Sequence, residues 1–453
     1  MKPHIARISA LVAFACTAGA FGPACVRAQP APVGPDASVW LSHPLTLKEC
    51  IDLALQNNGE IVRAKQELEA NYGISMQVRS IALPQVKVSG DYVGYDAKNV
   101  EALELPIPAA THRWSGSVRL IQSIYEGGRI VSSVKAASLT KQQALFRYQA
   151  VVSDKILEVR TAYFDLLLAE ALSKSQQAAL DLQEKQNEDV SRRLGTGLVA
   201  HYDLLRSEVA LASARPKLLR AQNQLRIGKA KFSDLLGFRI PSDVWDDIPL
   251  RLADPLEAEA YDVTLPGAID RALANRPEIQ VQEKAVALQH EHLSDARAGF
   301  LPSVQVMGGY GGFNDDLDRD IHGWFAGAQV NWFLFDGLET QGKIKEAHAH
   351  LNAAQSALSD LKRAVGLEVR VAYSTFTEAK QELEAQEQAQ GLAEEGLRLA
   401  TSHYHAGELT QLDLMQSQTT LTDVRSNTLQ TLRDYDVAVA ALERAIGLPT
   451  DTK

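Results

Sequence analysis

The sequence predicts a mainly helical protein with a smaller membrane-spanning β portion. It is built from two tandem copies of one unit: a helix, two strands and a long helical hairpin. Three observations support this fold class: an internal repeat, four strand patterns with one apolar face, and long stretches without proline. Residues 45–55 align on residues 263–273 at an offset of 218. A loop further along is eight residues shorter in the second copy, so the offset becomes 210 and aligns residues 157–163 on residues 367–373. Two copies of this length indicate a duplicated half-structure, not a short-period solenoid.

The first residues indicate export. A basic start and an uncharged stretch over residues 8–26 predict a secretory signal peptide over residues 1–28, followed by an N-terminal segment over 29–44. The alternative is that Cys25 is a lipid-anchored first residue. Cleavage of the signal peptide leaves Cys50 without a cysteine partner, so we expect no intramolecular disulfide and a plain core role for Cys50.

Composition narrows the function classes. After the signal peptide no window approaches about 18 uninterrupted apolar residues, which argues against a transmembrane helix. The formal net charge of −10 argues against nucleic acid as a partner. No nucleophile elbow, phosphate-binding glycine loop or zinc-protease motif is present, so we expect neither an enzyme nor a cofactor. Three histidine pairs are spaced two apart, which places their rings on nearly opposite sides of a helix, so we expect no metal site from any one of them: His290/His292, His348/His350 and His403/His405.

Each copy begins with a helix that is interrupted. Thr46 and Glu49 form a capping box in the first copy, and Pro266 lies just inside the helix start in the second. The segments 57–59 and 275–277 contain Asn with Gly or Pro at matching points of the two copies. The sequence therefore predicts a break between two helical segments in each copy.

Two strands follow in each copy, at about residues 85–95 and 112–124, then 303–313 and 323–334. Their side chains alternate between a polar, charged face and an apolar face that carries aromatic residues. Strands of about ten residues with this pattern are what a lipid-facing barrel with a wet interior requires. The alternative is a surface hairpin over a soluble core. In the barrel interpretation four aromatic side chains face lipid: Tyr92, Trp114, Tyr310 and Trp324.

Long helical hairpins follow the strands. Residues 129–194 contain no Gly or Pro, and residues 338–406 contain no Pro. Each stretch is long enough for a rod on the order of 100 Å, and the chain returns through helices that end near Gly237 and Gly447. A free-standing coiled coil is the alternative, although strict heptads do not persist.

These patterns divide the chain. We expect a first repeat over 45–240, an inter-repeat linker over 241–262, a second repeat over 263–450 and a tail over 451–453. The linker is acidic and contains three prolines, so we expect an irregular connector that wraps the middle of the tube.

Four strands cannot close a barrel, and unpaired strand edges cannot face lipid, so closure requires other copies of the chain. Two copies give eight strands, whose interior side chains nearly fill the lumen, whereas three give twelve and a usable opening. A homotrimeric tube is the simplest solution.

At this point the residues carry a family resemblance. The motif T-L-x-x-x-I-D-x-A-L-x-N occurs in both copies, Leu-Pro precedes each first strand, and residues 122–128 and 333–337 carry related aromatic and glycine motifs after each second strand. The whole mature chain resembles the TolC-like outer-membrane efflux protein family. The resemblance implies a homotrimer with a twelve-stranded β-barrel in the bacterial outer membrane and a periplasmic α-helical barrel. It also implies docking to a periplasmic adaptor protein and, through it or at the tip, to an inner-membrane transporter.

The resemblance also implies site residues at the helix turns farthest from the outer membrane. Tyr404 is similar to the gate tyrosine of the family, and Asp203 and Asp413 are similar to its gate acids. Gln416 stands where a second aspartate is frequent, and Leu409 replaces a basic residue of some relatives. The adaptor-docking tips correspond to Gly195, Gly197, Leu198, Val199, Ala200, Gly407, Leu409 and Thr410.

Two roles are open for the gate acids. Three symmetry-related carboxylates in a narrow pore concentrate cations. Asp203 and Asp413 also stand where a side-chain oxygen caps a returning helix. The two roles are compatible.

The expected function is the outer-membrane channel of a tripartite efflux or secretion system that conducts substrates passively. An exit duct dedicated to type I protein secretion is the alternative within this class. A soluble periplasmic coiled-coil scaffold is the alternative from another class.

Overall fold

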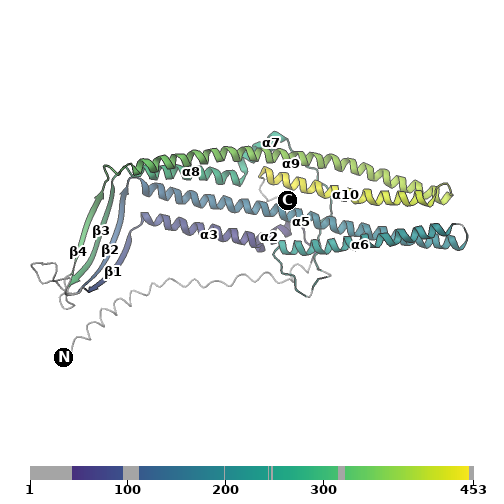
Figure 1. Cartoon of the computed structure of the whole chain (residues 1–453), viewed down its shortest axis with the longest axis horizontal. Helices are drawn as coiled ribbons and strands as arrows, with labels where there is room; N and C mark the ends of the chain where they lie inside the picture. Colours follow the sequence, from purple (N-terminus) through teal and green to yellow (C-terminus); the bar gives the residue numbers. More distant parts are fainter. Residues whose placement is uncertain are drawn as a thin grey trace, which may run out of the picture.

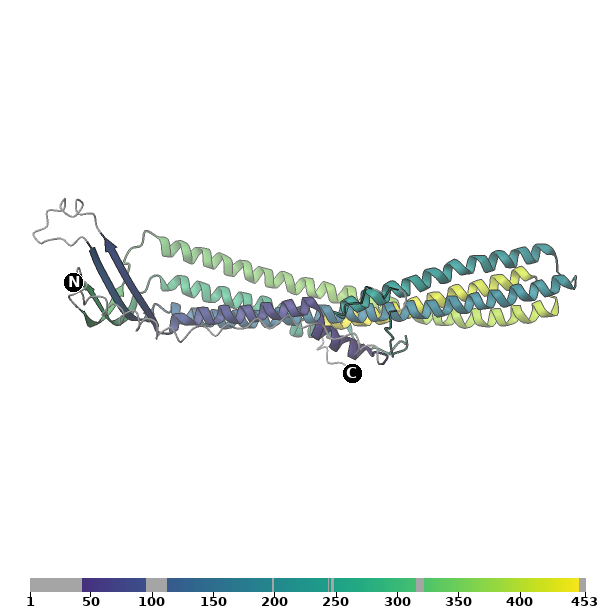
Figure 2. The ribbon, with the colours of Figure 1, turned by 90° about the horizontal axis from the view of Figure 1, so that it is seen from below.

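The computed structural model describes residues 43–94, 112–197, 199–242, 244–245, 248–314 and 322–447. The expected signal peptide, Cys25, Leu198 and the tail over 451–453 lie outside the described residues. The chain forms an elongated helical rod with a small sheet at one end and two helix turns at the other (Figures 1 and 2).

Both copies follow the predicted order of helix, two strands and long helical hairpin. The first contains α2 (Leu47–Asn57), α3 (Gly59–Arg79), the short 3-10 helix η2 (Ser80–Ala82), β1 (Gln85–Gly94), β2 (His112–Glu126), α5 (Arg129–Gly195) and α6 (His201–Leu235). The second contains α7 (Leu265–Asn275), α8 (Pro277–Ala298), β3 (Ser303–Asn314), β4 (His322–Asn331), α9 (Glu339–Ala406) and α10 (Gln411–Ile446). Helices α5 and α9 have 67 and 68 residues, because the prolines and glycines that would interrupt them are absent or sparse.

The predicted helix starts and breaks are confirmed. The Thr46 side chain accepts from the backbone N–H of Glu49, while the Glu49 carboxylate accepts from the backbone N–H of Thr46. The first break lies at Asn58, whose side-chain oxygen accepts from the backbone N–H of Glu60 and so begins α3. The second lies at Arg276, after which Pro277 opens α8.

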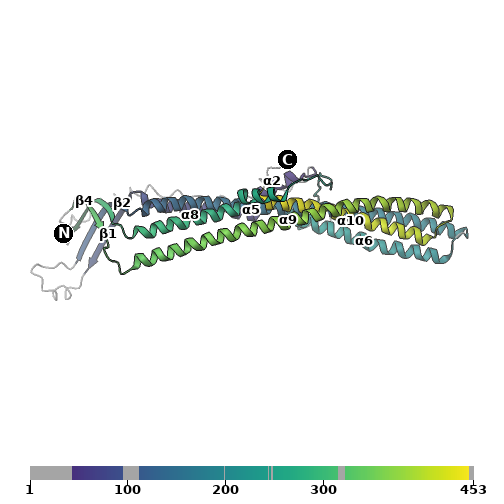
Figure 3. The same ribbon diagram turned by 90° about the horizontal axis from the view of Figure 1, so that it is seen from above.

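Because of these breaks, two shorter helices placed end to end run along one long helix. Helices α3 and α6 both pack along α5, whereas α8 and α10 both pack between α5 and α9. Figure 3 shows the short helices in the two halves of the rod and the long helices running through both. A glycine with positive φ follows each returning helix: at Gly237 (+80°) an added Cβ would meet Asn57, and at Gly447 (+72°) it would meet Arg276. Each returning helix therefore ends at the break of its own repeat.

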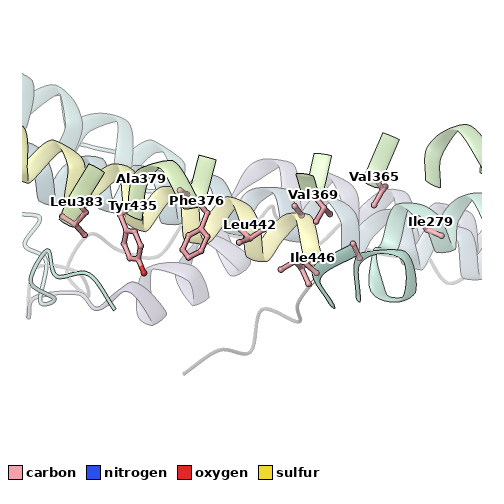
Figure 4. Packing of buried hydrophobic residues seen from close by; sticks show 13 residues of the cluster. Ile279, Val365, Val369, Phe376, Ala379, Leu383, Tyr435, Leu442 and Ile446 are labelled. Atoms are coloured by element: carbon pink, nitrogen blue, oxygen red, sulfur yellow. The ribbon is translucent and has the colours of Figure 1, made fainter. Parts of the chain in front are cut away.

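Two hydrophobic cores lie at this midpoint, one in each repeat. The first joins α2, α5, α6 and the linker around Cys50, Tyr163 and Phe232, and the expected core role of Cys50 is confirmed by its complete burial. The second joins α7, α8, α9 and α10; Figure 4 shows Val369, Phe376, Tyr435, Leu442 and Ile446 packed together. Outside these cores the helices are only partly buried along most of their length.

A charged network joins the repeats beside the second core. The Arg276 side chain, 5% exposed, contacts Glu278 at 3.2 Å and Glu368 at 2.5 Å, and Arg444 contacts Glu278 and, at 2.6 Å, Asp154 of α5. Burial alone would raise the pKa of Glu278, but the hydrogen bonds from Arg276 and Arg444 outweigh it and hold that pKa at about 2. Buried charges are tolerated here because each has a partner of opposite sign.

The linker is irregular over its described residues, apart from one bridge between Leu45 and Leu252. It is tied to the first core by Asp254, whose carboxylate accepts from the Tyr163 hydroxyl at 2.8 Å and from the backbone N–H of Leu47 at 2.9 Å. It is tied to the second repeat by the Tyr435 hydroxyl, which donates to the Glu259 carbonyl at 2.8 Å.

The expected end of the last strand, at residue 334, is wrong. Strand β4 ends at Asn331, which pairs with the first residue of β3, Ser303. Pro302 precedes Ser303 and has no N–H to extend the ladder. The chain turns away at Trp332, whose indole N–H donates to the Phe300 carbonyl at 3.1 Å. Strand β2 continues two residues beyond the expected end, through a bulge between Ser123 and Tyr125.

Replacement of Gly237 by Ala should destabilise the rod by about 1–3 kcal/mol, because the residue has a left-handed backbone and a Cβ would lie 2.5 Å from the Asn57 carbonyl oxygen. Thermal unfolding of the detergent-purified protein measures this. Gly342→Ala is the matched control, since Gly342 lies within α9 with nothing within 4 Å of its Cβ position. Equal melting temperatures for the two variants would contradict the account of the midpoint junction.

A second prediction concerns Asp436 of α10, which is 8% exposed and whose Oδ2 has no hydrogen-bond partner within the described part of the chain. Burial raises the pKa of Asp436 from its ordinary 3.8 to about 7, although Arg160 opposes the rise. A carboxyl group with a raised pKa in the folded state binds its proton more tightly there, so stability is lost as the pH rises from about 4 to about 7.

Asp436→Asn should therefore be more stable than the wild type at pH 8, by on the order of 1–3 kcal/mol, and the difference should vanish at pH 4. Denaturant unfolding at both pH values measures this. Asp434→Asn is the control, because the Asp434 side chain is 55% exposed. A constant difference between pH 4 and pH 8 would contradict the assignment.

Candidate functional site: an amphipathic sheet and a helical tip

The four strands form one antiparallel sheet in the order β1–β2–β3–β4. The middle pair, β2 and β3, joins the two repeats. Its register aligns the apolar positions of all four strands on one face: Tyr92 lies opposite Trp114, Val118 opposite Tyr310, and Tyr310 opposite Trp324. The aromatic residues predicted to face lipid therefore share one face of the sheet.

This apolar face is uncovered in the single chain. Tyr92 is 71% exposed, Val88 is 74% exposed and Trp324 is 81% exposed. Figure 2 shows the sheet extending beyond the ends of the helices. A contiguous exposed apolar face of this kind marks a surface that meets a membrane or another protein.

The opposite face carries polar contacts along β1 and β2. The Ser89 and Ser117 hydroxyls lie 2.9 Å apart, and the Ser115 hydroxyl donates to the Asp91 carboxylate at 3.1 Å. Lys87 lies directly opposite Arg119 on this face. One face is therefore suited to water and the other to an apolar environment.

Both outer edges of the sheet are open within the described part of the chain. Strand β1 pairs only with β2, and β4 pairs only with β3. Each edge presents backbone N–H and C=O groups that another strand could pair. The sheet is thus an incomplete unit.

At the other end of the rod the two hairpin turns lie together (Figure 1). The α5–α6 turn contains Gly197 with a φ of +75°, and the α9–α10 turn contains Gly407 with a φ of +78°. The two turns touch where the Gln411 amide donates to the Asp203 backbone carbonyl at 3.5 Å. The expected tip residues of both repeats are therefore at one end, apart from Leu198, which lies outside the described residues.

The predicted capping role of both tip acids is confirmed. The Asp413 carboxylate accepts from the backbone N–H and the hydroxyl of Thr410, at 3.1 and 2.6 Å, and the Asp203 carboxylate accepts from the backbone N–H of Ala200 at 3.2 Å. The hydrogen bonds from the side chain and backbone of Thr410 lower the pKa of Asp413. Asp413 therefore stays charged at neutral pH while it caps α10.

Tyr404 is half-buried, and its contacts cross between the hairpins. The Arg193 guanidinium of α5 lies 5.1 Å from the centre of the Tyr404 ring, and its Nη2 lies 3.4 Å from Nδ1 of His405. Sequence reasoning missed Arg193 and Gln411, because no local pattern shows which faces of two distant helices meet. Gln416 is exposed, whereas Leu409 and Val199 are half-buried near the turns.

None of the helices in the described part of the chain has the combination of length and hydropathy that a transmembrane helix needs. No group of three or more His, Cys, Asp or Glu side chains there is arranged to hold a metal ion.

An amphipathic sheet with open edges at one end of a long helical rod defines the class of outer-membrane channel subunits. Comparison with known proteins agrees with this class. The family model described as Outer membrane efflux protein matches residues 50–237 and 268–448, which are parts of the two repeats. The chain belongs to this family, a family of channel proteins of the bacterial outer membrane that extend into the periplasm.

Individual relatives are distant but match along nearly the whole chain. The outer membrane protein TolC of Vibrio cholerae is 23% identical over 418 residues, covering 91% of this chain and 92% of the relative. The cobalt-zinc-cadmium resistance protein CzcC of Cupriavidus metallidurans is 22% identical, covering 89% and 90%. The CmeC outer membrane channel of Campylobacter jejuni has a similar fold, with a TM-score of 0.76 and 17% identity over 88% of this chain and 85% of that chain.

Loss of the Thr410 cap should loosen the start of α10. Thr410→Ala removes a cap of about 1 kcal/mol, so amide hydrogens of residues 411–414 should exchange about fivefold faster. Hydrogen–deuterium exchange measures this. The control is Thr420→Ala, because the Thr420 hydroxyl donates only to the Gln416 carbonyl within the helix. Unchanged exchange in Thr410→Ala would contradict the cap.

Proposed function

We propose that three copies of this chain form the outer-membrane channel of a tripartite efflux system, and that substrates pass through it from the periplasmic end to the exterior. The observation that carries the proposal is the sheet of the described residues. Its register places the apolar side chains of all four strands on one face, and its two outer edges are unpaired. Strand edges in a bilayer must be paired, and copies of the same chain supply matching edges.

Three copies suit both parts of the molecule. Twelve strands give a lumen wide enough to conduct, whereas eight strands fill it with side chains. In the rod, α9 lies along one side and α3 with α6 along the other, so the helices follow the same order as the strands. Closing the sheet into a ring therefore also closes the rod into a helical tube.

The two helix turns are the proposed entrance and docking site. Asp413, Asp203 and Tyr404 lie at this end, and a ring of three Asp413 carboxylates would favour cations. Gln416, one turn along from Asp413, adds no charge to that ring. The residues proposed to dock a periplasmic adaptor protein, with an inner-membrane transporter reached through it or at the tip, are Gly195, Gly197, Leu198, Val199, Ala200, Gly407, Leu409 and Thr410.

The channel does no chemistry in this proposal. Energy comes from the inner-membrane transporter, and the chain supplies a passive path. Its relatives include a protein named for cobalt, zinc and cadmium resistance and others named as efflux-pump components, so efflux of small solutes or ions is proposed ahead of protein secretion. A soluble scaffold is disfavoured by the exposed apolar face of the sheet.

Single-channel conductance in a planar bilayer tests the proposal. The detergent-purified wild type should give discrete steps with a preference for cations, and Asp413→Ala should reduce that preference because it removes three carboxylates from the entrance. Asp423→Ala is the control, since Asp423 is an exposed residue ten positions further along the same helix.

The outcomes separate the two parts of the proposal. Conductance steps with equal selectivity in the wild type, Asp413→Ala and Asp423→Ala would support the channel, but Asp413 would then act only as a helix cap. A wild type that needs no detergent and gives no conductance would contradict the channel itself.

A further inference from the structure

We propose that Lys87 and Arg119 form a positively charged ring inside the strand barrel, near its helix end, and that this ring favours anionic solutes where they pass from the helical tube into the barrel. The inference rests on the proposed function, because it requires the polar face of the sheet to line the lumen. The solutes favoured are those with carboxylate, phosphate or sulfate groups.

The first support is the register of β1 and β2. Lys87 lies directly opposite Arg119 on the polar face. Like charges directly opposite each other across an antiparallel pair are destabilising. The Lys87–Arg119 pair therefore lowers the stability of the sheet, and the packing of the sheet does not offset this loss.

The second support is the lack of a carboxylate partner. Arg119 donates from Nη2 to the Ser89 hydroxyl at 3.2 Å, while its Nε is buried with no hydrogen-bond partner within the described chain. No ion pair to Lys87 or Arg119 is formed among the described residues. Asp91, an acid of the same face, accepts from Ser115 instead. Within the described residues of one subunit, the two cations are thus not neutralised.

The third support is that β3 and β4, which continue the sheet beside the cations, contain no Asp, Glu, Lys or Arg. Gly309 of β3 lies next to Arg119, and Gly311 lies next to Ser117. A Cβ at Gly309 would lie 2.4 Å from the Val118 carbonyl oxygen, so a side chain is excluded there. On β4, Gly323 and Gly327 of the same face have nothing within 4 Å of their Cβ positions. The Phe325 ring of β4 lies beside Gly309, since the Cβ position of Gly309 is 2.9 Å from Phe325 Cζ. The neighbours of the two cations on this face are therefore neutral, and none of them cancels the positive charge.

Three copies would place six such cations around one level of the pore. Rings of Lys and Arg favour anions, because the narrow low-dielectric wall concentrates their field. The channel would then have opposite charge preferences at two levels, with acids at the helical entrance and cations inside the strand barrel. The ion selectivity of the conductance reflects both charged levels together. The test therefore has to measure the electrostatic potential inside the barrel alone.

A cysteine at Ser117 samples the local potential, because Ser117 is on the polar face two residues from Arg119. The probes are two membrane-impermeant thiosulfonates of similar size, one with a sulfonate and one with a trimethylammonium group, added from the exterior to the full-length protein in vesicles. The native Cys50 is completely buried and serves as an unreactive background. Each labelling rate is divided by the rate of the same probe with a free thiol.

Ser117→Cys should react faster with the anionic probe than with the cationic probe. Adding Lys87→Gln and Arg119→Gln should reduce this preference roughly threefold or more, as expected for loss of a potential of at least about half kT. Lys87→Arg with Arg119→Lys is the matched control and should retain the preference, since both charges remain. The single variants Lys87→Gln and Arg119→Gln should each give part of the loss, which keeps the test valid if the double variant does not assemble.

An unchanged preference in the neutralised variants would overturn the charged ring while leaving the channel intact. Val118→Cys separates this from failure of the proposed function, because Val118 belongs to the apolar face. Val118→Cys should react with neither probe. Labelling of Val118→Cys without labelling of Ser117→Cys would reverse the assignment of the faces and overturn both proposals.

Discussion

Unpaired backbone groups along the outer edges of β1 and β4 are the constraint on which the architecture depends. In hydrocarbon each unpaired N–H or C=O costs several kcal/mol, and within the described residues the four strands of one chain pair only along their inner edges. The same two sides are open in the rod, where α9 lies along one side and α3 with α6 along the other. In the proposed channel the chain is therefore one section of a ring, and its copies complete the sheet and the helical tube together.

The midpoint of the rod makes this section possible. A sheet and a hairpin tip about 100 Å apart require helices of unusual length. The chain solves this with two continuous helices and two pairs of short ones that meet at the breaks, where Gly237 and Gly447 allow close contact. Hydrophobic burial is concentrated at this junction, and the Arg276–Glu278–Arg444 network of the second repeat contacts Asp154 of the first repeat there.

Much of the fold could be predicted from the sequence because its determinants are local. The capping box at Thr46, the breaks at Asn58 and Pro277 and the alternation along the strands all depend on neighbouring residues. The predicted end of β4 was wrong, because the apolar residues Trp332 and Phe333 follow Asn331 in the sequence, whereas strand pairing stops where β3 begins. Contacts such as Arg193 with Tyr404, and the burial of Asp436, depend on the rotation of distant helices about their axes, which no local pattern specifies.

The central claim is that the open edges close only against other copies, and the mass of the intact assembly tests it most directly. Native mass spectrometry of the detergent-extracted, mature protein should give three chains as the dominant species, and dissociation should release single chains without a stable two-chain form. A dominant single chain, or an assembly of two or four copies, would contradict a twelve-stranded closure and with it the account of how the sheet enters the membrane.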